Sequence, residues 1–437
     1  MHPSRGGLAV ALFTALAPVI LAVGPAVADP SPATVDVVKV HGVIDPAQAS
    51  YVRGSIESAE QAGATVVLQL DSKGAYGDQA ERLARVIRSS SVPIVVWVGP
   101  SGARAAGGAL FILYSSSLAA MAPGSGVGPG VPFDLATSAS KESPSVVAEA
   151  TASLLALASG AEARAEGVRA AAAGPALPAG PALDRGAVAL VAVDIPDLLT
   201  KLGGRTIRTA DGAVTLITAS KPGHPVTVRF HEIGPVRGVL HVMSIPTAVY
   251  VALLLGLWAL AFELTQPGVG VAGLAAIPAL ALAGYGLSVI PVDWVGAGMI
   301  LAGTASLALD VIVHRVQWFT LAGAGLFAAG SLLAWHGVAP AIHLPLWLVM
   351  VATVGSTLFF GFAMTVALRS RERIHSAQVG LVGLVGEARS DLDPEGGVLV
   401  KGSLWRARTM DGDIPRGARV RVRSIDGLIL RVEPEPD

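Results

Sequence analysis

The sequence has no cysteine and few charged residues, and each shortage excludes a class of protein. Without cysteine the chain has no disulfide, no thiolate metal site and no cysteine nucleophile. Charged residues make up 14%, against about 25% in ordinary soluble domains. Hydrophobic residues make up 52% and the mean hydropathy is +0.61, so membrane spans are expected. The 31 basic residues balance 32 acidic ones, which gives no global argument for nucleic acid or acidic partners.

The N-terminus has the pattern of an export signal. A single arginine precedes a long apolar run, and Ala26-Val27-Ala28 before Asp29 has the A-x-A form of a cleavage site. We therefore predict a signal peptide over residues 1–28, with an uncleaved membrane anchor as the alternative. Either interpretation places the residues after Asp29 outside the cytoplasm.

Residues 30–240 have soluble character and alternate between strand and helix patterns, which predicts a mostly parallel sheet covered by helices. Residues 123–132 are too rich in glycine and proline for a regular element, and signals are weak from there to Asp184 apart from a helix over 144–158. Residues 202–240 alternate like β-strands. The predicted strands are 35–42, 64–72 and 92–99, and the predicted helices run from the Asp45 N-cap to Ala62 and from Asp78 to Ser89.

A membrane region is predicted over residues 244–370. Apolar windows long enough to span a bilayer lie at about 245–263, 270–290, 294–313, 317–335 and 345–368, which gives about five spans. If the first domain is outside, the basic residues 314–315 and 369–373 fall inside, as the positive-inside rule expects. We therefore predict an integral protein of the cytoplasmic membrane with its N-terminal domain extracytoplasmic.

The tail, residues 378–437, is expected to be a small cytoplasmic all-β barrel of OB type, because short alternating segments are separated by glycine and aspartate turns. OB barrels bind either nucleic acid or protein. Only Trp405 offers a base-stacking surface, which favours a protein-contact or structural module and no nucleic acid.

Other motifs give no cofactor or metal site. Residues 268–273, GVGVAG, match a dinucleotide-binding pattern but begin a membrane span and do not follow a strand. The nine histidines lack metal-ligand spacing. Glu263 and Asp310 lie at the ends of predicted spans, where water can solvate them. We predict no cofactor and no metal.

The stretch Ser101–Ile112, SGARAAGGALFI, follows a buried strand and leads into an apolar helix. Hydrolases often place a nucleophile at such a turn, yet Ala105-Ala106-Gly107-Gly108 has no side chain that can attack a substrate.

The order of these parts resembles the long form of the NfeD (nodulation formation efficiency D) family. The resemblance rests on VVKVHGVIDPAQASYV at residues 37–52, the Asp71-Ser72 turn, PSGARAA with AAMAPGSGVG at 100–128, FELTQPG at 262–268, and the GLVGLVGEA…W…GARVRV pattern of the tail at 380–422. It implies an α/β domain of ClpP/crotonase-like fold, a helical transmembrane bundle and an OB-type barrel.

The resemblance also implies the site residues. The family's protease uses a Ser–Lys dyad, in which burial keeps the lysine neutral so that it accepts the serine proton. Here Gly107 occupies the nucleophile position, and Lys141 aligns with the base and is interpreted as vestigial. The family's oxyanion turn, D-T-P-G-G, is replaced by residues 71–75, DSKGA, so that Gly74 and Ala75 mark the oxyanion and peptide groove.

These departures predict a pseudoenzyme that serves as a scaffold or as the peptide-binding partner of a stomatin/prohibitin-type (SPFH) membrane protein. The implied partners are that protein, apolar peptide segments and membrane lipid, and the groove domain is expected to allow a homo-oligomer. The alternative is an active Ser–Lys protease with a relocated nucleophile, for which Ser101 and Ser115 are the candidates. A transporter built on the spans is disfavoured, because no paired ionisable residues lie at mid-depth.

Overall fold

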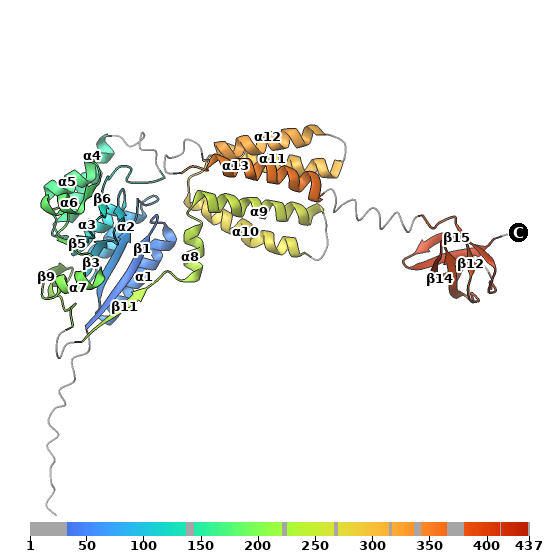
Figure 1. The fold of residues 1–437 in the computed structure, drawn as a ribbon, viewed down its shortest axis with the longest axis horizontal. Helices are drawn as coiled ribbons and strands as arrows, with labels where there is room; N and C mark the ends of the chain where they lie inside the picture. Colours follow the sequence, from blue (N-terminus) through green and yellow to red (C-terminus); the bar gives the residue numbers. More distant parts are fainter. Residues whose placement is uncertain are drawn as a thin grey trace, which may run out of the picture.

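Three structured regions follow one another along the chain: an α/β domain, a group of apolar helices and a small barrel (Figure 1). The computed structural model describes residues 33–136, 144–220, 225–265, 270–313, 317–335, 342–364, 380–410 and 412–435. The predicted signal peptide lies outside these ranges.

A six-stranded parallel sheet forms the centre of the α/β domain, as the alternating pattern predicted. The strand order is β11-β1-β2-β3-β5-β8, and every neighbouring pair is parallel. The strands are β1 (Ala33–His41), β2 (Thr65–Asp71), β3 (Ile94–Val98), β5 (Leu118–Met121), β8 (Leu190–Val191) and β11 (Val226–His231).

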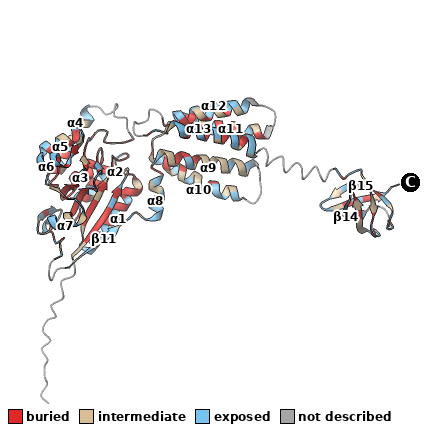
Figure 2. Ribbon diagram, in the orientation of Figure 1, coloured by how far each residue is buried: buried red, intermediate tan, exposed pale blue. Residues whose placement is uncertain are grey.

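Side chains of the sheet alternate between two apolar cores, one on each face. Val37, Val67 and Val95 lie side by side in register and belong to the core on the α7 side. Val38 and Leu68 point the other way, into the core beneath α1, α2 and α3. This period-two alternation buries both faces of the strands, as Figure 2 shows.

Short elements complete the domain. The α1 helix begins after the Asp45 cap, whose side chain accepts from Gln48 N, and ends at Gly63 with a φ of 61°, both as predicted. The weakly patterned stretch to Asp184 contains two helices, and the segment expected to be wholly β-like ends in a helix, α8. The helices are α1 (Pro46–Ala62), α2 (Gln79–Arg88), α3 (Ala109–Ser115), α4 (Pro144–Ala158), α5 (Ala165–Ala173), α6 (Ala179–Asp184), α7 (Ile195–Leu202) and α8 (Pro235–Val242); β4 (Arg104–Ala105), β6 (Gly126–Val127) and β7 (Leu177–Pro178) form a small sheet, and β9 (Thr206–Thr209) pairs with β10 (Gly212–Thr215).

A bidentate ion pair holds the edge strand β11. The fully buried Asp36 carboxylate accepts from Arg229 Nε at 2.7 Å and from Arg229 Nη2 at 2.8 Å, and His231 Nε2 lies 3.2 Å away. Burial by itself raises the pKa of Asp36, but the two hydrogen bonds from Arg229, with His231 close by, outweigh it, so that the pKa is lowered. Strand β11 is therefore held to β1 by this ion pair as well as by backbone hydrogen bonds.

Five apolar helices follow, but fewer of them are long enough to cross a bilayer than the sequence windows suggested. Within the described residues, three qualify by length and composition: Pro246–Leu264, Val271–Val289 and Trp294–Val311. The expected count of about five is therefore too high by this measure, because windows count composition and the last two helices are short. The helices are α9 (Pro246–Thr265), α10 (Val271–Val289), α11 (Trp294–Val313), α12 (Gln317–Leu333) and α13 (Leu346–Leu358), the last continuing as a π-helix over Phe359–Met364.

Glycines let these helices pack backbone to backbone. A Cβ atom on Gly303 in α11 would lie 2.6 Å from Phe327 N and 2.8 Å from Gly323 O, both in α12. On Gly286 in α10 it would lie 2.3 Å from the side chain of Val249 in α9. Without a side chain at these positions the helices approach closely and gain van der Waals contact that lipid cannot replace.

The C-terminal region is a closed five-stranded barrel, as predicted, with strand order β12-β13-β14-β16-β15. Trp405 is half-buried and packs against the barrel core. Several of the arginines pair with neighbouring acids: Arg406 with Glu395, Arg423 with Glu433 and Arg431 with Asp426. The strands are β12 (Val385–Ala388), β13 (Glu395–Val400), β14 (Ser403–Thr409), β15 (Arg419–Asp426) and β16 (Ile429–Pro434).

The helix packing predicts that Gly303→Ala destabilises the membrane region while Gly298→Ala does not. At Gly303 the added methyl group meets backbone atoms of α12, and such overpacking costs roughly 1–3 kcal/mol. At Gly298, in the same helix, nothing lies within 4 Å. Thermal unfolding of the full chain in detergent, followed by circular dichroism, measures both. Equal midpoints for the two variants would contradict the packing.

Candidate functional site

The turn after strand β2 lies beside the start of helix α3, at the carboxyl ends of the parallel strands. Ser72 forms a parallel bridge with Ala105, and Ala106 N donates to Ser72 O at 3.1 Å. Asp71 Oδ1 accepts from Arg104 N at 2.9 Å. These contacts bring the groove residues Gly74 and Ala75 next to Gly107. Open α/β sheets commonly hold their sites at this edge.

Backbone atoms occupy the space around Gly107. The residue has a φ of +56°, which disfavours any side chain, and a Cβ atom on it would lie 2.5 Å from Pro132 O. On Gly108 a Cβ atom would lie 2.8 Å from Phe133 O. Two successive carbonyl groups therefore rest on two successive glycines. The position has neither a nucleophile nor room for one in this arrangement.

The chain's own segment 131–136 covers the groove turn. Ala75 and Asp134 form a parallel bridge, and Leu135 N donates to Ala75 O at 2.9 Å. Asp134 Oδ1 accepts from Gly77 N and from Ala136 N, each at 2.8 Å. Gly74, with a φ of +150°, lies against Leu135, whose Cγ would be 2.7 Å from a Cβ atom there. The backbone edge at Ala75 is thus already paired.

Two of the three nearby serine hydroxyl groups, those of Ser72 and Ser115, form hydrogen bonds with the backbone. Ser72 Oγ donates to Gly74 O at 2.9 Å and accepts from Gly74 N at 3.2 Å. Ser115 is buried in α3, and its Oγ donates to Ile112 O at 3.0 Å. Ser101 is exposed, with its Oγ beside Gly124. Lys141 lies outside the described residues.

Sequence reasoning did not find the covering segment. The segment 131–136 overlaps the end of the glycine- and proline-rich stretch 123–132, which predicts only a turn and does not indicate what the following residues contact. The double glycine at 107–108 is the signal that was available, because paired glycines in a buried turn indicate close backbone approach.

The site lies against the ends of the apolar helices. Tyr76 and Leu135 belong to one apolar cluster with Val249 and Tyr250 at the start of α9. Tyr76 Oη donates to Ser244 O at 3.1 Å, and burial raises the pKa of Tyr76 to about 12, so that it stays a neutral donor.

A buried ion pair fastens the last helix of the α/β domain. His241 Nδ1 in α8 lies 2.6 Å from Asp45 Oδ2, and Asp45 is fully buried. Its other oxygen, Oδ1, caps α1 through Gln48 N at 2.8 Å. The hydrogen bond to Asp45 raises the pKa of His241 above 6.5, although burial opposes it.

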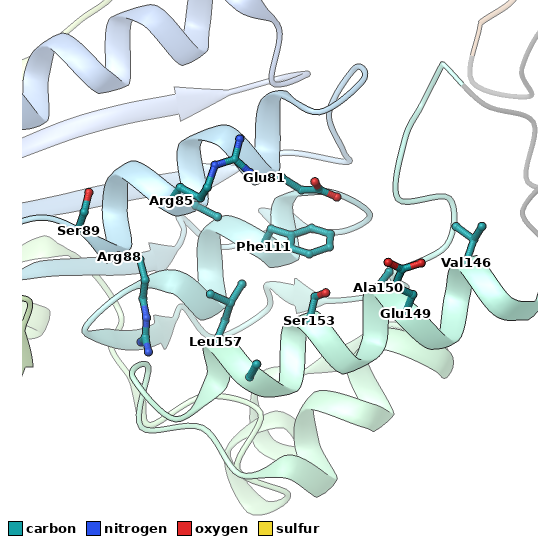
Figure 3. A pocket seen from close by; sticks show the side chains of 12 residues that line it. Glu81, Arg85, Arg88, Ser89, Phe111, Val146, Glu149, Ala150, Ser153 and Leu157 are labelled. Atoms are coloured by element: carbon teal, nitrogen blue, oxygen red, sulfur yellow. The ribbon is translucent and has the colours of Figure 1, made fainter.

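A hollow of about 890 Å³ lies elsewhere, between α2 and α4 (Figure 3). Arg85 and Glu81 reach it from α2, Phe111 from α3, and Glu149 and Leu157 from α4. Neither the turn 71–75 nor Gly107 lines it, so this hollow is separate from the candidate site. Across the described residues, no group of three or more histidine or acidic side chains is placed to hold a metal ion.

These features define a membrane protein that carries an α/β domain with a hydrolase-like turn and a separate small barrel. Residues 247–365 match the NfeD integral membrane domain, and residues 379–434 match the NfeD-like C-terminal, partner-binding domain. The chain is also similar to the membrane-bound protease PH1510 of Pyrococcus horikoshii, with 28% identity over 400 residues that cover 87% of this chain and 88% of that protein.

Two solved structures from Pyrococcus horikoshii also resemble parts of the chain. One is 1510-N, a membrane protease specific for a stomatin homolog, with 25% identity, a TM-score of 0.41, and coverage of 48% of this chain and 98% of that one. The other is the C-terminal domain of the stomatin operon partner protein 1510-C, with 41% identity, a TM-score of 0.14, and coverage of 14% and 95%. The membrane region and the barrel of the chain are therefore similar to the corresponding NfeD domains.

The His241–Asp45 pair predicts that α8 holds less firmly to the domain at alkaline pH. Because the folded-state pKa of His241 is raised above 6.5, its contribution is complete below pH 6.5 and is lost as the pH rises through the folded value. Amide exchange of α8 in the full chain, corrected for intrinsic rates, should therefore accelerate as the pH rises above 6.5.

The control is His241→Gln, which cannot titrate and should remove this pH dependence. In His241→Ala, α8 is expected to open more easily by roughly 3 kcal/mol, because the buried Asp45 carboxylate loses its partner. A wild-type exchange profile without a pH-dependent step would contradict the prediction. The same step in His241→Gln would show that another group titrates.

Proposed function

We propose that the chain is a non-cleaving NfeD protein, a membrane scaffold for a stomatin/prohibitin-type membrane protein. The observation that carries the proposal is the packing of Pro132 O against Gly107, at 2.5 Å from where a Cβ atom would stand. A hydrogen in place of a CH₂OH group removes covalent catalysis, and the covering segment leaves no space to restore it. In this proposal Gly107 marks the nucleophile position and Lys141 is a vestigial base.

Gly74 and Ala75 would be the remains of the oxyanion and peptide groove. The Gly74 N–H, a candidate oxyanion donor, is instead directed at Ser72 Oγ. An apolar peptide that adds as a strand along Ala75 must displace Asp134 and Leu135 from that edge. Peptide binding is therefore expected to be conditional on movement of this segment.

The barrel would supply the contact with the partner protein. Its match to a partner-binding domain and the printed names of the relatives, which refer to stomatin, support this assignment. Leu404 and Leu428 are 69% and 75% exposed; Leu404 is the second residue of β14, and Leu428 directly precedes the neighbouring parallel strand β16. Exposed leucines on a small barrel are suited to an apolar surface of another protein.

The proposed topology places the α/β domain outside the cytoplasmic membrane and the barrel in the cytoplasm. The signal-peptide pattern and the basic residues 314–315 and 369–373 support it, although all of them lie outside the described residues.

The lack of a nucleophile predicts that a fluorophosphonate probe does not label the full chain in membranes, whereas an active serine hydrolase in the same sample is labelled. Gly107→Ser should not be labelled either, because the added side chain meets Pro132 O. This variant should also lose roughly 1–3 kcal/mol of stability. Mass spectrometry of the probe adduct reads out both.

The matched control is Gly102→Ser, which adds a hydroxyl at another glycine of positive φ, where nothing lies within 4 Å. It has the strain of a side chain at positive φ but lacks the clash with Pro132 O, so it should lose less stability than Gly107→Ser. A labelled serine in the wild-type chain would reject the proposal, and loss of that label in Ser101→Ala or Ser115→Ala would establish the relocated-nucleophile protease instead.

The partner assignment predicts that Leu404→Ser combined with Leu428→Ser reduces co-purification of the full chain with a stomatin-type protein from the same cells at least several-fold. Surface changes of this kind alter stability little, so the fold is retained. The control is Val382→Ser, which removes an exposed apolar side chain at a different place on the barrel. Unchanged co-purification in the double variant would exclude this surface as the contact.

A further inference from the structure

Helix α8 exposes an apolar stripe immediately before the first membrane span. Val236, Val239 and Val242 are 73%, 47% and 47% exposed, and Ile245, just beyond the helix, is 50% exposed. A spacing of three residues places the valines along one face of the helix. Figure 2 shows α8 as exposed or intermediate, and it has no buried residue.

The opposite side of α8 is fixed to the protein, so the stripe has a defined orientation. His241 pairs with the buried Asp45, and α8 contacts α1 and the membrane helix α10. Just after the helix, Ser244 O accepts from Tyr76 Oη, and Ser244 Oγ donates to His241 O at 2.7 Å. The stripe cannot turn inward without breaking these contacts.

The stripe is continuous with the surface that faces lipid. Helix α9 begins at Pro246, directly after Ile245, and exposes Val251 and Leu255 farther along. In Figure 1, α8 runs across the direction of α9 and α10, at the end of these helices next to the α/β domain. A short helix that lies across the spans at their end is at the level where headgroups meet acyl chains.

We propose that α8 is an interfacial helix that inserts Val236, Val239 and Val242 into the leaflet next to the α/β domain. This lipid contact would hold the domain at a fixed height and orientation above the membrane. Continuity with the membrane-spanning surface identifies the occupant as phospholipid. The contact is independent of whether the domain cleaves peptides.

The experiment uses the absence of cysteine from the native chain, which permits single labels without background. Val236→Cys, Val239→Cys and Val242→Cys are made in the full chain, spin-labelled and reconstituted in phosphatidylcholine vesicles. For each spin label, the rate of collision with oxygen, which partitions into lipid, is compared with the rate of collision with a water-soluble nickel chelate. The oxygen-to-nickel ratio is expected to be several-fold higher at the three positions than at Val193→Cys, which is 64% exposed before α7.

Arg237→Cys is the control on α8 itself, because Arg237 is exposed on a different face and should give a lower ratio than its valine neighbours. Ratios at the valines equal to that at Val193→Cys would show that the stripe faces water and would overturn the proposal. Low collision with both reagents would show that protein, such as a second copy of the chain, covers the stripe, and this result would also overturn it.

Discussion

One buried carboxylate joins the α/β domain to the membrane region. Asp45 is fully buried, and its two oxygens have separate partners: Gln48 N, which begins helix α1, and His241, which holds helix α8. An unpaired charge at this depth would be strongly unfavourable, so both partners are required together. Since α8 leads directly into α9, this side chain helps to fix the candidate site relative to the apolar helices.

The candidate site combines a hydrolase-like location with a structural use of that location. The turn lies at the carboxyl ends of parallel strands, where α/β proteins place reactive groups. Here the same place is filled by backbone, with Pro132 O and Phe133 O packed on Gly107 and Gly108. A fold does not determine an activity, and a domain can retain its sheet and its turn while the chemistry is lost.

The sequence predicted those parts whose causes are local. The Asp45 cap, the Gly63 stop and the buried strands follow from single residues and short periods, and the structure confirms them. The covering segment was not predictable, because it is short and follows a glycine- and proline-rich stretch that has no period to indicate contacts. Helix α8 was missed because valines separated by polar residues also read as a strand. The span count was too high because windows measure apolar content and not helix length.

The covering segment connects the groove to the membrane helices. Leu135 pairs with Ala75 through its backbone, packs on Gly74 through its side chain, and belongs to the cluster that includes Val249 and Tyr250 of α9. A peptide strand that takes the edge at Ala75 competes with a segment tethered in place at high effective concentration, and it must also remove Leu135 from that cluster. If a peptide binds at this edge as proposed, its binding is linked to the packing of Leu135 against α9. Such linkage is reciprocal: a partner that binds at the helix ends would change the peptide's affinity by the same factor by which the peptide changes the partner's affinity.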